Sequence, residues 1–110
     1  MIKSLPHILV VCGKNRIRSL TAEHLFMHDP RFEIRSAGVS EEARHVVSRK
    51  DLEWADHIVC METKHKERIL QKFPETEASN IQVIEVPDEF SYMNPELVTV
   101  LQMKFDDLLL

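Results

Sequence analysis

Four short runs rich in apolar and β-branched residues are separated by segments with helical spacing, and this alternation limits the folds open to the chain. The runs are residues 7–11, 32–36, 57–61 and 81–86. Each run has the length and composition of a buried strand. A strand, helix, strand order repeated along 110 residues is typical of a parallel sheet with helices on both faces. The pattern predicts a single α/β domain over residues 1–110, a three-layer sandwich with a four-stranded parallel sheet.

The segments between these runs carry helix signals. They predict helices over residues 19–28, 48–54, 63–73 and 94–108. Ser19 and Ser48 are placed to cap the first two helices. Asn94 followed by Pro95 is typical of a helix start, and apolar residues recur at helical spacing after it. The last helix is therefore the one that the sequence predicts most clearly.

The overall composition limits the partners and the compartment. The formal net charge is −4, which argues against a general nucleic-acid binder because such proteins need a basic surface. No apolar run approaches membrane-spanning length, and the first residues lack the pattern of a secretory signal. Cys12 and Cys60 are the two cysteines, so there is no disulfide framework. We expect a cytoplasmic protein that binds neither nucleic acid nor membranes, with any anion site confined to one locality.

The segment between the first predicted strand and the first predicted helix, residues 12–19, combines a cysteine with three basic residues. Such a turn points backbone N–H groups into a concavity, and the positive end of the helix dipole adds to the attraction for an anion. Arg18 offers a planar pair of donors for two phosphate oxygens. The same surroundings favour the thiolate of Cys12, with Ser19 placed to donate to it, and a thiolate beside a phosphoryl group is a nucleophile.

The order of residues in this segment resembles the signature of the low-molecular-weight protein tyrosine phosphatases. That signature is a cysteine after the first strand, five residues and then Arg-Ser, and Cys12, Asn15, Arg18 and Ser19 match it in register. Further similar segments are residues 21–26, 35–38 and 55–61. The resemblance implies a flavodoxin-like, phosphotyrosine phosphatase I-like fold with strand order 2-1-3-4. The chain resembles a shortened member, with the missing length mainly between residue 38 and residue 88.

The resemblance also implies a reaction and the residues that perform it. Cys12 would attack phosphorus to give a phosphocysteine that water hydrolyses, while Arg18 and the loop amides stabilise the charge on the phosphoryl oxygens. Asn15 resembles the asparagine that holds the loop in a left-handed conformation. The expected phosphate-binding residues are Gly13, Lys14, Asn15, Arg16, Ile17, Arg18 and Ser19.

The proton for the leaving group comes, in this family, from an aspartate in an Asp-Pro-aromatic segment. The corresponding segment here reads VPDEFSYM, so Asp88 is the expected acid, but the order Pro87-Asp88 is reversed. Glu85 and Glu89 therefore remain alternatives. Phe90 resembles the aromatic residue that walls the phosphotyrosine pocket, and Tyr92 is a weaker candidate for that role.

Other positions depart from the family pattern. Lys14 replaces a glycine, Arg16 stands where an apolar pocket residue is expected, and Ile17 replaces a second cysteine. The two basic residues either favour highly charged substrates or point to solvent. Phosphocarriers that resemble enzyme IIB subunits and arsenate reductases remain alternative classes, although the Arg18-Ser19 pair argues against the first and the lack of further cysteines against the second. A module of the same fold that only binds phosphate is a third alternative, and it applies if Asp88 does not reach the site.

The expected ligands and partners follow from these assignments. The substrate is a phosphotyrosine protein or a small aryl phosphate, and phosphate or sulfate would bind in the same place. No cofactor and no metal are expected, because the His24 and His28 pair lacks a third ligand. We expect a monomer or a weak dimer.

Overall fold

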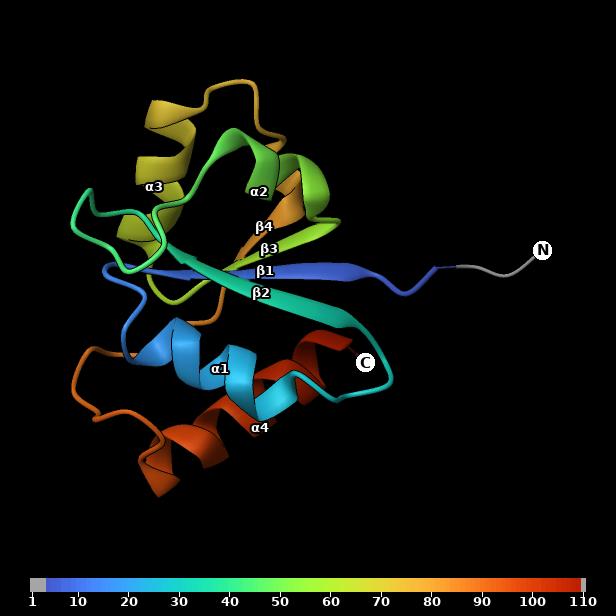
Figure 1. Ribbon diagram of the computed structural model, residues 1–110, viewed down its shortest axis with the longest axis vertical. Helices are drawn as coiled ribbons and strands as arrows, with labels where there is room; N and C mark the ends of the chain where they lie inside the picture. The colour runs from blue at the N-terminus through green and yellow to red at the C-terminus, as the bar shows by residue number, and fades with distance from the viewer. Residues whose placement is uncertain (1–3, 110) are drawn as a thin grey trace.

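The computed structural model describes residues 4–109 as a parallel sheet between two layers of helices (Figure 1). The elements in chain order are β1 (His7–Cys12), α1 (Arg18–Phe26), β2 (Glu33–Gly38), α2 (Arg49–Trp54), β3 (His57–Cys60), α3 (Thr63–Lys72), β4 (Ile81–Val83) and α4 (Pro95–Leu109), with a short 3-10 turn at Ala78–Asn80. All strands run parallel in the order β2-β1-β3-β4. The predicted fold class and strand order are confirmed.

The central strand β1 divides the core into two halves. Ile8, Val10 and Cys12 face the cluster formed with α1 and α4, whereas Leu9 and Val11 face the cluster formed with α2 and α3. This division follows from the two-residue period of a strand. Figure 1 shows the same pairs of helices on opposite faces of the sheet. Because every one of these β1 residues is buried, β1 is a rigid support for the loop that follows it.

The largest differences between the predicted and observed strands are at β2 and β4. β2 begins at Glu33 and continues to Gly38, because its last residues pair with the end of β1. β4 contains only three residues, although the predicted strand had six. Its continuation still follows β3, since the backbone N–H of Val86 donates to the carbonyl of Met61 at 2.8 Å. The regular backbone pairing with β3 is interrupted at Glu85, which has a φ of 53°.

The capping predictions have mixed outcomes. Ser48 caps α2 and forms a capping box with Asp51, and the Asn94 side chain accepts from the backbone N–H of Glu96 at 2.9 Å, so both caps are confirmed. The prediction for Ser19 is wrong. Ile17 occupies the cap position of α1 without a side-chain cap bond, and Ser19 lies inside the first turn. Its hydroxyl instead contacts Cys12 at the end of β1 and Asn15 in the loop before the helix.

None of the helices within residues 4–109 has the length and apolar composition of a membrane-spanning segment.

Candidate active site

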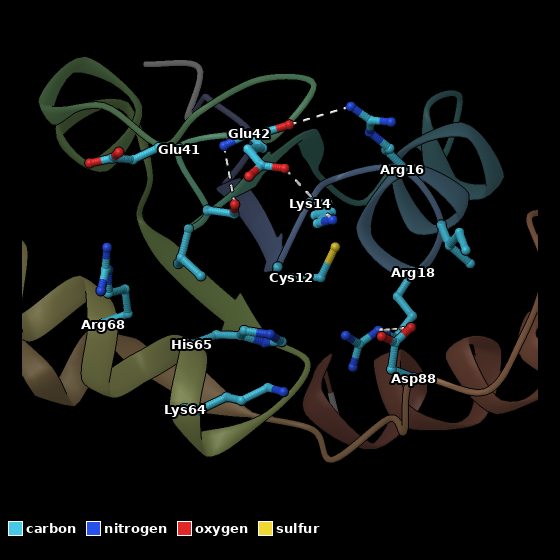
Figure 2. A pocket seen from close by; sticks show the side chains of 14 residues that line it. Cys12, Lys14, Arg16, Arg18, Glu41, Glu42, Lys64, His65, Arg68 and Asp88 are labelled. Carbon is cyan, nitrogen blue, oxygen red and sulfur yellow. Dashed lines mark hydrogen bonds and ion pairs between the residues drawn. The ribbon is translucent and has the colours of Figure 1, made fainter.

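A pocket of about 850 Å³ opens at the carboxyl edge of the sheet, where ligands bind in folds of this kind (Figure 2). Cys12 lies at its centre, between the loop of residues 13–18 and the first turns of α3. The lining residues are Cys12, Gly13, Lys14, Arg16, Ile17, Arg18, Val39, Ser40, Glu41, Glu42, Lys64, His65, Arg68 and Asp88. The structure therefore brings the three predicted catalytic residues, Cys12, Arg18 and Asp88, to one pocket.

Cys12 and Ser19 are joined directly. The Sγ and Oγ atoms lie 2.9 Å apart, and both side chains are buried. Asn15 Nδ2 donates to the Ser19 oxygen at 2.8 Å, so the Ser19 hydroxyl hydrogen is free to point elsewhere. Its two possible acceptors are the Cys12 sulfur and, at 3.4 Å, the carbonyl of Ala37. The Cys12 sulfur is the nearer of the two, so the serine hydroxyl is within donating distance of a Cys12 thiolate.

Asn15 fixes the conformation of the phosphate-binding loop through its backbone angle and its buried side chain. Its φ is 56°, a left-handed conformation that asparagine tolerates better than most residues, and its side chain is fully buried. In addition to Ser19, its Nδ2 donates to Ser36 at 2.9 Å, and the Ser36 hydroxyl donates to Glu23. The loop conformation thus depends on side chains from β2 and α1. Ser36, the serine of the 35–38 segment, links Asn15 to Glu23.

Gly38 is required because the loop approaches β2 too closely for a side chain. A Cβ atom at this position would lie 2.5 Å from the carbonyl oxygen of Gly13 and 2.6 Å from Ala43 Cβ. We expect Gly38→Ala to lower the free energy of unfolding by about 1–3 kcal/mol, the range for an overpacked site. Urea unfolding measures it. The matched control is Gly13→Ala, whose methyl group would meet only His65 Nε2 at 3.9 Å. Equal stabilities for the two variants would contradict this account.

Arg18 is held at the pocket by its own Nη1 atom. This nitrogen donates to Glu62 at 2.6 Å and to the carbonyl of Val86 at 2.8 Å, and the side chain is 5% exposed. The bond from Arg18 lowers the pKa of the Glu62 carboxyl, so the partner stays charged. Both bonds use Nη1, which leaves Nη2 and Nε for the oxygens of an anion. Asp88 lies beside Nε, with its Oδ1 atom 3.8 Å away.

His65 lies under the same pocket and is neutral. Its Nδ1 accepts the backbone N–H of Glu62 at 3.1 Å, so the ring proton is on Nε2, which is buried without a partner. Burial, with a smaller contribution from Arg18, lowers the pKa of His65 to about 4.

The low pKa of His65 predicts a pH dependence of stability. Between the unfolded value of about 6.5 and about 4, the unfolded chain binds a proton that the native state does not bind. The free energy of unfolding should therefore fall with decreasing pH in this window, by up to about 3 kcal/mol. His65→Asn keeps an acceptor for Glu62 and removes the titration. Urea unfolding at pH 7, 5.5 and 4.5 should show a smaller fall for the variant, and equal falls would contradict the assignment.

The remaining predicted residues occupy different places. Lys14 and Arg16 line the pocket mouth, where Lys14 lies 3.9 Å from the Glu42 carboxylate and Arg16 donates to the Glu42 carbonyl at 3.4 Å. Phe90 packs against the core cluster on the α1 and α4 side and is not among the pocket-lining residues. Its role as a pocket wall stays a prediction. Tyr92 accepts or donates a hydrogen bond with His24 at 2.6 Å.

Sequence reasoning missed Glu62 and His65. A signal was present, because Glu62 follows β3 by two residues and β3 pairs directly with β1. The carboxyl ends of adjacent parallel strands lie at one edge, so a carboxylate there is close to Arg18.

Within residues 4–109, no group of three or more His, Cys, Asp or Glu side chains is arranged to hold a metal ion.

Comparison with solved structures identifies the fold as that of low-molecular-weight protein tyrosine phosphatases. SP-PTP, a phosphatase of this class from Streptococcus pyogenes, matches with a TM-score of 0.80 and 17% identity over 96% of this chain and 91% of that chain. Tyrosine phosphatase Wzb from Escherichia coli K30, in complex with phosphate, has a TM-score of 0.77 and 21% identity over 96% of each chain. The YwlE arginine phosphatase from Geobacillus stearothermophilus has a TM-score of 0.68 and 24% identity over 94% and 85%. No protein-family model and no curated protein matches the sequence.

Proposed function

We propose that the chain is a cysteine-dependent phosphatase that hydrolyses phosphotyrosine, or a similar aryl phosphate monoester, through a phosphocysteine intermediate. The observation that carries this proposal is the grouping of Cys12, Ser19 and Arg18 on one loop, with Arg18 oriented by Glu62 and two of its nitrogens left for an anion. The fold is shared with phosphatases, one of which is described in complex with phosphate. This similarity supports the same reaction class.

In the first step, the Cys12 sulfur attacks phosphorus, so that the S–P bond forms as the bond from phosphorus to the phenolic oxygen breaks. Arg18 and the loop amides stabilise the charge on the three nonbridging oxygens. Asp88 gives its proton to the leaving phenolate. In the second step, Asp88 takes a proton from water as that water attacks phosphorus and the S–P bond breaks. Ser19 donates to the departing sulfur, which is already its neighbour at 2.9 Å.

Asp88 is the proposed acid because it lines the pocket beside Arg18, whereas Glu85 lines a different pocket and Glu89 lines neither. We expect Asp88→Asn to lower kcat/KM on a phosphotyrosine peptide by about a hundredfold, the lower range for general acid catalysis. The loss should be smaller on para-nitrophenyl phosphate, because its leaving group needs less protonation. The matched control is Glu89→Gln, which should retain activity on both substrates. Equal losses in both variants would remove Asp88 from this role.

The function itself is tested by hydrolysis of para-nitrophenyl phosphate and a phosphotyrosine peptide by the wild-type protein with EDTA present. Turnover of both is the expected result. Failure on both, with phosphate binding retained, would contradict the phosphatase and favour a phosphocarrier or a binding module of the same fold.

Two observations bear on the other expectations. Cys60 lies on the opposite face of the sheet from Cys12, and burial raises the pKa of the Cys60 thiol to about 12. These two cysteines are therefore poorly placed to exchange a disulfide as an arsenate reductase requires. Both cysteines are free, which supports a cytoplasmic location in a reducing compartment. We propose a monomer or a weak dimer that acts without a cofactor.

A further inference from the structure

The pocket continues beyond the phosphate-binding loop along the first turns of α3. Lys64, His65 and Arg68 form this side, which we call the α3 wall, and Glu41 and Glu42 lie on the side opposite (Figure 2). The volume of about 850 Å³ is near the upper end for ligand pockets and far exceeds the space that one phosphoryl group fills. The α3 wall is therefore placed to contact another part of the substrate.

The two cations of the α3 wall are poorly neutralised. Among residues 4–109, the side chain of Arg68 forms no ion pair or hydrogen bond. Lys64 has one ion pair, a 3.8 Å contact with Glu62, whose same oxygen already accepts from Arg18 at 2.6 Å. On the opposite side, the Glu42 carboxylate pairs with Lys14 at 3.9 Å, and Glu41 is the other carboxylate of that side, so the pocket lining still has more cations than carboxylates. The pocket thus has unneutralised positive charge on one wall, in a chain with a net charge of −4.

The base of the α3 wall also has an excess of donors. His65 is 1% exposed, and its Nε2–H has no hydrogen-bond acceptor in the described part of the chain, because the Glu62 carboxylate oxygen beside it is 3.9 Å away. Figure 2 shows the His65 ring extending from α3 toward Cys12. A buried donor without an acceptor is unfavourable by about 1–3 kcal/mol, and an anion nearby would reduce that cost. Charge and hydrogen-bonding capacity on this wall both favour a negatively charged ligand.

We propose that Lys64 and Arg68 form a second anion subsite, and that the substrate is an aryl phosphate that carries a second anionic group. This inference rests on the proposed phosphatase function. In a protein substrate the second group is an aspartate or glutamate near the phosphotyrosine, and in a small substrate it is a carboxylate on the aromatic compound. The phosphoryl group occupies the loop of Cys12 and Arg18, while the second anion contacts the α3 wall.

The test compares kcat/KM for matched substrates: phosphotyrosine peptides with glutamate or with glutamine on either side, and phenyl phosphates with and without a carboxylate. Wild type should prefer the acidic member of at least one pair by about tenfold, the effect of two partly exposed ion pairs. The preference should shrink at high salt. A preference within the peptide pair indicates a protein substrate, and a preference within the phenyl phosphate pair indicates a small-molecule substrate.

The variants locate the preference. Lys64→Gln with Arg68→Gln should reduce the ratio of acidic to neutral substrate to about one, and Lys64→Glu with Arg68→Glu should favour lysine-flanked peptides. The control, Lys50→Gln with Lys72→Gln, removes the same charge from exposed positions outside the pocket and should keep the wild-type ratio.

Each failure has a different meaning. A wild-type ratio near one with good turnover, or a tenfold ratio that survives in the Lys64 and Arg68 variants, would overturn the subsite and leave the phosphatase intact. No hydrolysis of any substrate would overturn the proposed function, and the subsite with it.

Discussion

Cys12→Ser should abolish hydrolysis of both para-nitrophenyl phosphate and a phosphotyrosine peptide, with a loss in kcat of at least about four orders of magnitude. A serine hydroxyl at this position is a far weaker nucleophile than a thiolate and lacks a general base to activate it. The phosphate-binding groups are unchanged, because the loop amides and Arg18 do not depend on the sulfur. The variant should therefore still bind the phosphopeptide.

Two measurements separate loss of the nucleophile from loss of the fold. Urea unfolding should show Cys12→Ser to be folded, and calorimetric titration should show saturable binding of the phosphotyrosine peptide. Cys60→Ala is the matched control, since Cys60 is equally buried but belongs to the other half of the core. Activity in Cys12→Ser, or inactivity in a folded Cys60→Ala, would contradict the assignment of the nucleophile.

Arg18→Lys should have the second largest effect, a loss in kcat/KM of about a thousandfold. Lysine keeps the charge but has no planar pair of donors, so it cannot contact Glu62 and two phosphoryl oxygens together. The substitution also leaves the carbonyl of Val86 without its buried donor, so some loss of stability is expected.

The control for this substitution is Arg49→Lys, an exposed arginine on α2 that pairs with Glu75. It should change neither kcat/KM nor the unfolding midpoint appreciably. Phosphate protection against unfolding gives an independent readout, because Arg18→Lys should weaken it and Arg49→Lys should not. A fully active Arg18→Lys variant would show that transition-state charge is stabilised by other groups.

The sequence was sufficient for the order of elements and for the grouping of Cys12 with Arg18. The signals were local there: apolar runs of strand length, an Asn94-Pro95 helix start, and one continuous loop. The topology then placed Asp88 at the same edge of the sheet. The role of Ser19 was only partly predicted, because its value as a helix cap and as a hydrogen-bond partner of Cys12 compete, and the second prevails.

Other features depend on contacts between distant segments. Glu62 contacts Arg18 across 44 residues, and the expected strand order places β3 beside β1 without showing which side chain after β3 reaches Arg18. Gly38 has a negative φ, so its importance comes from the approach of the phosphate-binding loop and not from a turn. The positive φ of Glu85, just after β4, has no local signal in the sequence, because glutamate rarely adopts that conformation. These features depend on how distant segments pack together, so they cannot be predicted from any one segment of the sequence.

Cys12 should carry the phosphoryl group during turnover. To test this, wild-type protein is mixed with para-nitrophenyl phosphate, quenched in acid within milliseconds and measured intact by mass spectrometry. We expect a transient mass increase of one phosphoryl group, located on Cys12 by peptide mapping, together with a burst of nitrophenol. Product formed with no covalent species, or a phosphoryl group on another residue, would contradict it.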